Sequence, residues 1–323
     1  MRELTITKND AGQRLDRFVS KAVPLLPESL LQKYIRLKRI KVNGKGAKGG
    51  LRLAMGDVIQ LYINDEFFEK PSENNAYLKI VSPKLSIIYE DENILLVDKP
   101  PGMLCHSDGR FNTDNLVAHI QAYAYQSGQW KPREENSFAP ALCNRIDRNT
   151  GGIVIAAKNA EALRIMNQKI RDREIDKYYL CIIHGSPVPP SGILHGFIVK
   201  DTDKNQVCVK NRFVPGSKPA ETEYRTLATK RGLSLLECRL LTGRTHQIRA
   251  QLAAIGHPLL GDIKYGGEKL NKAYGERSQA LYSYKLVFSF KTHGGPLEYL
   301  KDMSFTAPRI NFVEKHFNFD FLH

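Results

Sequence analysis

The spacing of apolar residues over the first sixty positions predicts two short helices. One helical face in the segment 14–23 is formed by Leu15, Phe18 and Val19. A second helix is expected within the segment 28–38, where one face combines Leu30, Tyr34 and Leu37. Lysines and arginines fall off this second face, so the helix is predicted to be amphipathic and basic toward solvent.

Short strands are expected to follow. The sequence IKVNGK at 40–45 predicts a strand and a turn at Asn43-Gly44, and residues 51–63 predict a turn and an alternating strand. Prolines and polar residues at 64–84 indicate a linker. We therefore divide the chain into a small first domain with its linker (1–75) and a larger second domain (76–323).

Longer apolar runs from residue 85 onward predict strands buried in the second domain. Two runs around residues 90–93 predict a hairpin that ends at Pro100-Pro101-Gly102. Further strands are expected at 152–158, 177–185, 222–229 and 233–241. In the strand at 177–185, the period of two places Tyr179 on one face of the sheet and Tyr178 on the other.

Two helices are predicted between these strands. The first follows residue 158, with Asn159 as its N-cap and an apolar face formed by Leu163, Met166 and Ile170. The second lies within 242–258 and ends at Gly256 and Pro258. Its apolar stripe is expected to contain Ile248, Leu252 and Ile255.

Composition adds the class of protein. The chain has 323 residues, 42% of them hydrophobic, which suits about two domains of roughly 150 residues. It contains no apolar run of about 18 residues that would span a membrane and no apolar signal sequence near its charged start. The five cysteines are widely spaced; they suit buried reduced thiols in a cytoplasmic protein rather than a metal or redox motif.

Charge points to a polyanionic partner. The net charge is +14, and residues 11–63 carry eleven lysines and arginines against three acids. Such clustering is an electrostatic footprint for nucleic acid, whereas a charge coat that serves solubility would be spread evenly. The residues expected to contact RNA phosphates here are Lys33, Arg36, Lys38, Arg39 and Lys41.

The sequence NRIDRNTGG at 144–152 places one carboxylate, Asp147, between two arginines, Arg145 and Arg148. Asp, Asn, Thr and Gly are turn formers, so this segment taken alone favours a structural turn. The alternative is a catalytic carboxylate that neighbouring cations hold ionised. The segment by itself does not choose between them.

Three segments together resemble the RluA-type RNA pseudouridine synthases. NRIDRNTGGIVIAAKN resembles their catalytic motif, KYYLCIIHG their second motif, and LLTGRTHQIRAQLAAIGHPLLGDIKYG their third. ENILLVDKPPGM is similar to a segment that precedes the first motif. The basic first domain resembles the small alpha-L RNA-binding motif that larger members of this family carry.

This resemblance implies an α+β fold, with a mixed, largely antiparallel sheet and flanking helices. It implies an isomerase that converts uridine to pseudouridine in structured RNA, most simply large-subunit ribosomal RNA, without metal or cofactor. The catalytic roles fall on Asp147 as nucleophile or charge stabiliser, Arg249 as its cationic partner, and Tyr179 as the residue that stacks on the base. We expect a monomer whose partner is RNA, with no membrane and no small-molecule cofactor. The sequence leaves open whether that RNA is free or part of an assembling ribosomal subunit.

Further RNA contacts are implied around the cleft, at Arg145, Arg148 and Arg244. Arg145 would fill the space left when the target base is flipped out of the RNA, and Lys158 and His246 would lie near the cleft or hold its loops. The sequence departs from the family pattern at Asn144, Gly151, Gln251 and Tyr282, where His, Ser, His and His are usual. These departures bear on the substrate and the shape of the pocket.

Two other readings stay open at this stage. A non-catalytic RNA-binding or ribosome-assembly protein could use the same scaffold, although it has no need to keep Asp147, Tyr179 and Arg249 together. A metal-dependent nuclease or hydrolase using Asp147 would need more carboxylates or histidines around it.

Overall fold

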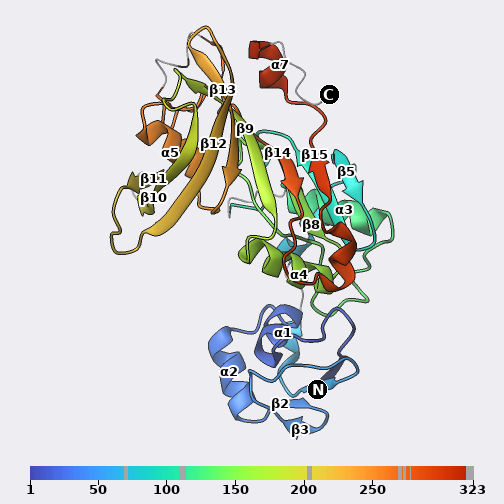
Figure 1. The fold of residues 1–323 in the computed structure, drawn as a ribbon. Coiled ribbons are helices and arrows are strands. Elements are labelled where there is room, and N and C mark those ends of the chain that lie inside the picture. Colours follow the sequence, from blue (N-terminus) through green and yellow to red (C-terminus); the bar gives the residue numbers. More distant parts are fainter. Residues whose placement is uncertain are drawn as a thin grey trace.

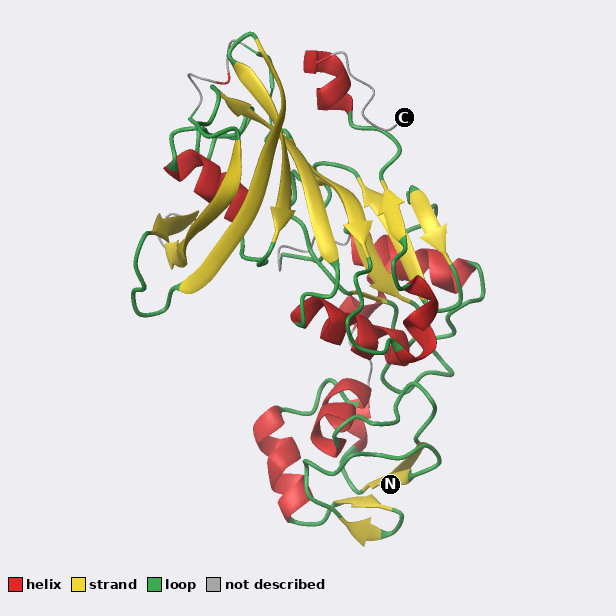
Figure 2. Cartoon of the chain, in the orientation of Figure 1, coloured by secondary structure: helices red, strands yellow, loops and turns green. Residues whose placement is uncertain are grey.

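The first sixty-eight residues form a small α+β unit with its own core (Figures 1 and 2). The computed structural model describes residues 1–68, 72–108, 114–201, 206–267, 271, 274–276 and 278–317. The helices of the first unit are α1 (Leu15–Ala22) and α2 (Glu28–Arg36). Its antiparallel sheet has the order β1 (Arg2–Thr5), β4 (Val58–Leu61), β2 (Ile40–Val42) and β3 (Lys45–Gly46).

The helices of this unit confirm one predicted face and correct another. Leu15, Phe18 and Val19 of α1 are fully buried, as their spacing predicted. In α2 the buried residues are Leu31, Tyr34 and Ile35, and Leu37 lies past the helix end with 54% of its surface exposed. The predicted stripe was correct at Tyr34, but Leu31 is buried where Leu30 was expected. Both leucines fit a helical period, and the core of this unit determines which one is buried.

The segment between the two units has structure of its own. The 3-10 helix η1 (Asp65–Phe68) ends the first unit, and the 3-10 helix η2 (Ser72–Lys79) follows in this segment. The buried ring of Tyr77 packs edge-on against Trp130, with ring centroids 5.1 Å apart. Whether a domain boundary lies at residue 75 stays a prediction.

Polar contacts also join the first residues to the larger unit directly. Asp10 is fully buried and accepts hydrogen bonds from Asn136 Nδ2 at 2.8 Å and Ser137 Oγ at 2.6 Å. Asn9 Oδ1 accepts from the backbone N of Ala160 at the start of α4. The linker is therefore not the sole connection between the two units.

One large mixed sheet organises the rest of the chain. In spatial order its main path is β11 (Gln206–Lys210), β10 (Ser191–Asp201), β12 (Lys218–Lys230), β13 (Leu233–Leu240), β9 (Asp176–His184), β14 (Leu281–Val287), β8 (Gly151–Ala157), β6 (Ile94–Lys99) and β5 (Ile87–Glu90). β7 (Ala141–Leu142) pairs with β8, and β15 (Ser304–Thr306) pairs with β14. Among the described residues β14 and β8 form the one parallel pair, which confirms the largely antiparallel α+β prediction.

Helices cover both faces of this sheet. They are α3 (Leu116–Gln126), α4 (Ala160–Arg171), α5 (Gln247–Ala254), α7 (Asn311–Phe317) and the 3-10 helix η3 (Gly295–Leu300). Residues of α4, η3 and α7 share one core with one face of β8 and β9. α3 packs on the opposite face over β6 and β8, and α5 packs over β9 and β13 on that same side.

Local signals in the sequence account for most of these elements. Asn159 caps α4 by accepting a hydrogen bond from the backbone N of Ala162 at 2.8 Å, as predicted. Asn43 and Gly44 both have positive φ in the turn between β2 and β3. α5 begins only at Gln247, and Ile255 of its predicted stripe is exposed, because the helix ends before it.

None of the helices in the described part of the chain is long and apolar enough to cross a bilayer.

Candidate active site

A cleft of about 590 Å³ opens beside the start of α5, between the turn that leads into this helix and the loops 104–108 and 143–150. That volume is in the range of pockets that hold a small ligand or a single nucleotide. Its walls come from the loop before β8, from the start of β9, and from the turn that leads into α5. The residues with candidate chemistry that line it are Arg145, Asp147, Arg148, Lys177, Tyr179, Arg244, His246 and Arg249.

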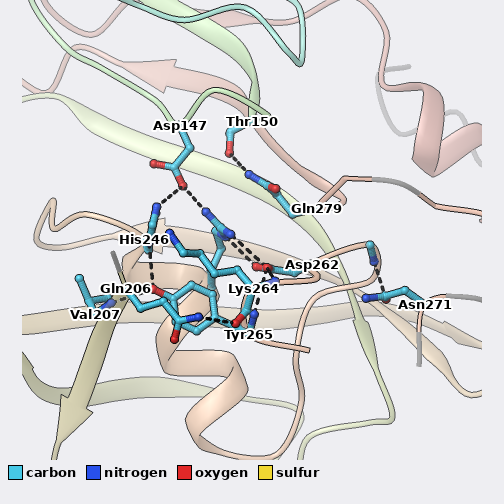
Figure 3. Close-up of polar contacts among 12 residues, drawn as sticks. Asp147, Thr150, Gln206, Val207, His246, Asp262, Lys264, Tyr265, Asn271 and Gln279 are labelled. Atoms are coloured by element: carbon cyan, nitrogen blue, oxygen red, sulfur yellow. Dashed lines mark hydrogen bonds and ion pairs between the residues drawn. The ribbon is translucent and has the colours of Figure 1, made fainter. Parts of the chain in front are cut away.

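Asp147 lies in the loop between β7 and β8, with 26% of its side chain exposed to the cleft. Its backbone carbonyl accepts from the N of Thr150 at 3.1 Å, so the segment does form a turn. Its carboxylate accepts from Arg249 Nη1 at 2.8 Å (Figure 3). The turn and the candidate catalytic carboxylate are therefore the same feature, because the turn directs the side chain into the cleft.

Arg249 is held in place from behind. Its side chain is 7% exposed, and Nε and Nη2 donate to Asp262 Oδ2 and Oδ1 at 2.6 and 3.0 Å. Burial disfavours its charge, but the hydrogen bonds with Asp262 and the charges of Asp262 and Asp147 raise the pKa of Arg249 above its ordinary value. The guanidinium fork thus fixes one fully buried carboxylate and presents its remaining donor to Asp147.

His246 is a second neighbour of Asp147. Its Nε2 lies 3.7 Å from Asp147 Oδ2, and its Nδ1 lies 2.9 Å from the hydroxyl oxygen of Tyr265. The backbone is left-handed there, with φ of 53°, which turns the chain into α5. Burial lowers the pKa of His246, with help from the charges of Arg249 and Lys264, and outweighs the opposing effect of Asp147. The imidazole is therefore mainly neutral at neutral pH, and the charged partner of Asp147 is Arg249.

Tyr179 faces the cleft from β9, and Tyr178 faces away, as the strand period predicted. Tyr179 is buried with Cys181 and Ile183 against α5, whereas Tyr178 lies under Arg239 and Lys285 on the other face. Burial, with a smaller contribution from Asp147, raises the pKa of Tyr179 to about 12. The phenol therefore keeps its proton at neutral pH.

Three arginines of the larger unit that were predicted to contact RNA line the cleft: Arg145, Arg148 and Arg244. Arg145 and Arg148 are exposed, and Arg148 Nε donates to the carbonyl of Gly102. Arg244 Nε donates to the carbonyl of Pro219 at 3.0 Å. Lys158, in contrast, pairs with Glu90 of the β5–β6 hairpin at 2.7 Å. It is not among the residues that line the cleft.

Sequence reasoning missed the residues that support the site from beneath. Lys99 is fully buried, and its ammonium donates to the carbonyls of Pro100, Met103 and Arg148 at 2.9–3.0 Å. It thereby ties the Pro100–Gly102 turn to the loop that carries Asp147, and burial lowers its pKa to about 8. Lys99 lies in the segment ENILLVDKPPGM, and Asp262 lies in LLTGRTHQIRAQLAAIGHPLLGDIKYG. Their place in these segments was the signal that the sequence offered.

Comparisons with known proteins identify the family. The family model described as RNA pseudouridylate synthase matches residues 93–254, which include Asp147, Tyr179 and Arg249. An "Uncharacterized RNA pseudouridine synthase" of Mycoplasma genitalium is 33% identical over 292 residues, covering 88% of each chain. The chain belongs to the RNA pseudouridine synthase family.

Two further comparisons extend this result. A "Ribosomal large subunit pseudouridine synthase C" of Vibrio vulnificus is 29% identical over 300 residues and matches 91% of this chain and 90% of its own. The solved structure of human RNA pseudouridylate synthase domain containing 4 shares the fold with a TM-score of 0.55 at 21% identity, over 74% of this chain and 94% of that one. The protein is an isomerase of the RluA type, as the motifs predicted.

The departures of this pseudouridine synthase from its family pattern have local structural partners. Gln251 is buried, donates to the carbonyls of Leu194 and Ala220, and accepts from Thr222 Oγ1, so it fastens α5 to the sheet. Asn144 Oδ1 accepts from the backbone N of Ile155. Asn144 lines the cleft, whereas Gln251 is not among the cleft-lining residues.

Gly151 and Tyr282 depart from the pattern together, and the structure places them against each other. They are register partners on β8 and β14. A Cβ on Gly151 would lie 2.4 Å from Cε2 of Tyr282 and 3.1 Å from Cδ of Pro101. The ring of Tyr282 cannot move away freely, because its hydroxyl donates to Asp98 Oδ1 at 2.6 Å. The tyrosine thus occupies the space that a serine at position 151 would need.

We expect Gly151→Ser to destabilise the protein by about 1–3 kcal/mol, because it overpacks a buried contact. Adding Tyr282→His should recover much of this loss, since the smaller ring leaves room for the serine. Thermal unfolding of the wild type, both single variants and the double variant measures the coupling. Strictly additive effects of the two substitutions would contradict the proposed steric dependence.

Proposed function

We propose that this pseudouridine synthase acts through Asp147 on uridines of large-subunit ribosomal RNA. The observation that carries the catalytic assignment is the chain of contacts from buried Asp262 through Arg249 to Asp147 in the cleft. A carboxylate with one fixed cationic partner and a quarter of its surface open is placed to meet a substrate. The name of the Vibrio vulnificus relative supports the choice of RNA.

The reaction needs a carboxylate of this kind. The bond between ribose C1′ and uracil N1 breaks, the base turns, and C1′ bonds to C5 while the proton on C5 is lost to solvent and N1 is protonated. The substrate and product are isomers, so no electrons are exchanged with a cofactor. Asp147 would act as a nucleophile toward C1′ or C6, or as the negative charge that stabilises a positively charged ribose.

Arg249 and Tyr179 take complementary roles in this proposal. Arg249 keeps the carboxylate oriented toward the bound nucleotide, because its other two donors are occupied by Asp262. Tyr179 forms an aromatic wall on which the uracil can stack. With a pKa of about 12 the phenol serves as a platform or proton donor at neutral pH, and its anion is too scarce to serve as a resting base.

The target base in a folded RNA must leave its stack to reach Asp147. Arg145, which is exposed at the rim, is placed to enter the space that the base leaves. Arg148 and Arg244 line the same opening and would contact the phosphates on either side.

We further propose that residues 1–75 form an alpha-L RNA-binding domain and residues 76–323 the catalytic domain. In the first unit, Lys33, Arg36, Lys38 and Arg39 are exposed, and Lys41 is half-buried with its ammonium 5.1 Å from the ring of Tyr62. This basic surface would hold RNA phosphates while the cleft holds one nucleotide.

Replacing Lys33, Arg36 and Lys38 together with glutamine should weaken RNA binding without lowering the unfolding temperature. The slope of log affinity against log salt should fall by about 2–3, since each lost phosphate contact removes roughly one released counterion. Filter binding to transcribed large-subunit ribosomal RNA measures this slope. A Lys291→Gln, Lys301→Gln variant changes exposed lysines of the catalytic unit and serves as the control; an equal effect of both variants would count against a dedicated RNA surface.

A pseudouridine map of the source organism's RNA tests the function. The map compares the wild type, a deletion strain, and deletion strains that express the wild type or Asp147→Ala. A site in large-subunit ribosomal RNA that disappears, returns with the wild type and stays absent with Asp147→Ala is expected. A site restored by Asp147→Ala would refute the catalytic role, and a site confined to another RNA class would refute the proposed substrate.

A further inference from the structure

Lys177 is a half-buried cation that lines the cleft. It lies on β9 two residues before Tyr179, so the strand period puts both side chains on the cleft side, about 6.6 Å apart along the strand. It lines the cleft, and its ammonium lies 3.9 Å from where a Cβ on Gly243 would be. It therefore sits between the tyrosine platform and the turn that carries Arg244.

The ammonium of Lys177 has no hydrogen bond or ion pair with any described residue. The charge of its sequence neighbour Asp176 acts to raise the pKa of Lys177, but Asp176 itself pairs with Arg239 at 2.9 Å and accepts from Ser289 Oγ at 2.7 Å. Burial outweighs this carboxylate and lowers the pKa of Lys177. Among the residues that the structure describes, the ammonium is thus partly desolvated without a polar partner, which is unfavourable in the free protein.

The two lysines that are fully buried in the described part of the chain have hydrogen-bond partners. Lys99 donates to three carbonyls, and Lys169 bonds Glu174 at 2.6 Å and Thr292 Oγ1 at 2.8 Å. Buried charged groups in folded proteins ordinarily have such partners. Lys177 differs from both because it lines the open cleft, where a partner from outside the chain can reach its ammonium.

We propose that the ammonium of Lys177 binds a phosphate oxygen of the RNA strand held in the cleft. This inference rests on the proposed function, because RNA is the anion that enters there. Phosphate suits a lysine at this place, since an ammonium acts as a compact point charge. Together with Arg249, which fixes the carboxylate, Lys177 would fix the backbone of the nucleotide whose base lies on Tyr179.

Lys177→Met is the decisive variant because two roles predict opposite effects on stability. A phosphate-binding lysine is a liability in the free protein, so its removal should raise the unfolding temperature by about 2 °C or more. The same change should lower kcat/KM about tenfold or more on large-subunit ribosomal RNA transcribed with 5-tritiated uridine. A lysine with a structural role would instead give a lower unfolding temperature.

Salt dependence identifies the lost contact as a phosphate. The slope of log RNA affinity against log salt should fall by about 0.7–0.9 in Lys177→Met and stay near the wild-type value in Lys177→Arg. Lys285→Met is the matched control, because Lys285 lies on neighbouring β14 but over Tyr178 on the opposite face; its slope should be unchanged. An unchanged slope in Lys177→Met, or an equal loss in Lys285→Met, would overturn the assignment.

Filter binding measures these slopes without turnover, so they test Lys177 independently of catalysis. Absence of tritium release by the wild type would contradict the proposed substrate and leave the binding slopes to decide on Lys177. Normal wild-type turnover with an unchanged Lys177→Met slope would overturn the Lys177 assignment alone.

Discussion

Asp147→Asn is expected to reduce turnover of RNA uridine by about 10³-fold or more, because it removes the charge and the nucleophile while keeping the side chain's shape. The fold should be nearly unaffected. Arg249 keeps its two bonds to Asp262, at 2.6 and 3.0 Å, when Asp147 is neutral. The partly exposed position of Asp147 also lets water solvate whatever the asparagine leaves unsatisfied.

Tritium release from 5-labelled uridine under single-turnover conditions, together with thermal unfolding, checks this prediction. Asp172→Asn changes an exposed carboxylate just past α4 and serves as the control for an equal change in charge. RNA affinity of Asp147→Asn should fall little, since Lys and Arg contacts dominate binding. Turnover by Asp147→Asn at the wild-type rate would refute the catalytic assignment.

Arg249→Met is expected to remove both stability and activity. Asp262 is 1% exposed, and without the guanidinium its carboxylate would be buried without a cation. Loss of one member of a buried ion pair costs about 3–5 kcal/mol. Turnover should fall as well, because Asp147 loses the donor that lies 2.8 Å from it. Chemical denaturation and tritium release measure the two losses separately.

A second substitution separates these two consequences. Asp262 Oδ1 also accepts from the backbone N of Lys264 and Tyr265, and an asparagine can keep those bonds. Arg249→Met combined with Asp262→Asn should therefore regain stability, since no unpaired charge stays buried, yet remain inactive. Recovery of activity in the double variant would mean that Arg249 acts only by supporting the fold.

Arg249→Lys tests the need for the fork. Lysine keeps the charge but presents a single point of contact, and it cannot engage both carboxylates in the same planar geometry. An intermediate loss of stability with a large loss of turnover is expected, and wild-type values for both would contradict the proposed division of donors.

Local patterns in the sequence were sufficient to predict several elements. The alternation in 177–185 placed Tyr179 and Tyr178 on opposite faces, because a strand has a fixed period of two. Asn159 was recognisable as a cap because its side chain bonds a backbone N only three residues away. The motifs identified the family and the α+β fold, since their residue types and spacing resemble the family's pattern.

Patterns failed where a choice depended on distant packing. Leu30 and Leu31 fit the helical period equally well, and the core of the first unit buries Leu31 fully and Leu30 only in part. Ile255 belonged to an apolar stripe, but α5 ends one residue earlier and leaves it exposed. The strand β10 and the parallel pairing of β8 with β14 were not predicted, because strand partners are not encoded in local spacing.

The sequence by itself determined the reaction class, the carboxylate at Asp147 and the basic character of the first unit, because these depend on residue type and short spacing. Only the tertiary structure decided how Asp147 is held. Arg249 lies 102 positions from Asp147 along the chain. Its guanidinium donates to both Asp147 and Asp262. The lack of a polar partner for the Lys177 ammonium among the described residues and the steric pairing of Gly151 with Tyr282 were likewise decided there. A missing partner and an occupied volume are properties of three-dimensional packing, which residue order alone does not contain.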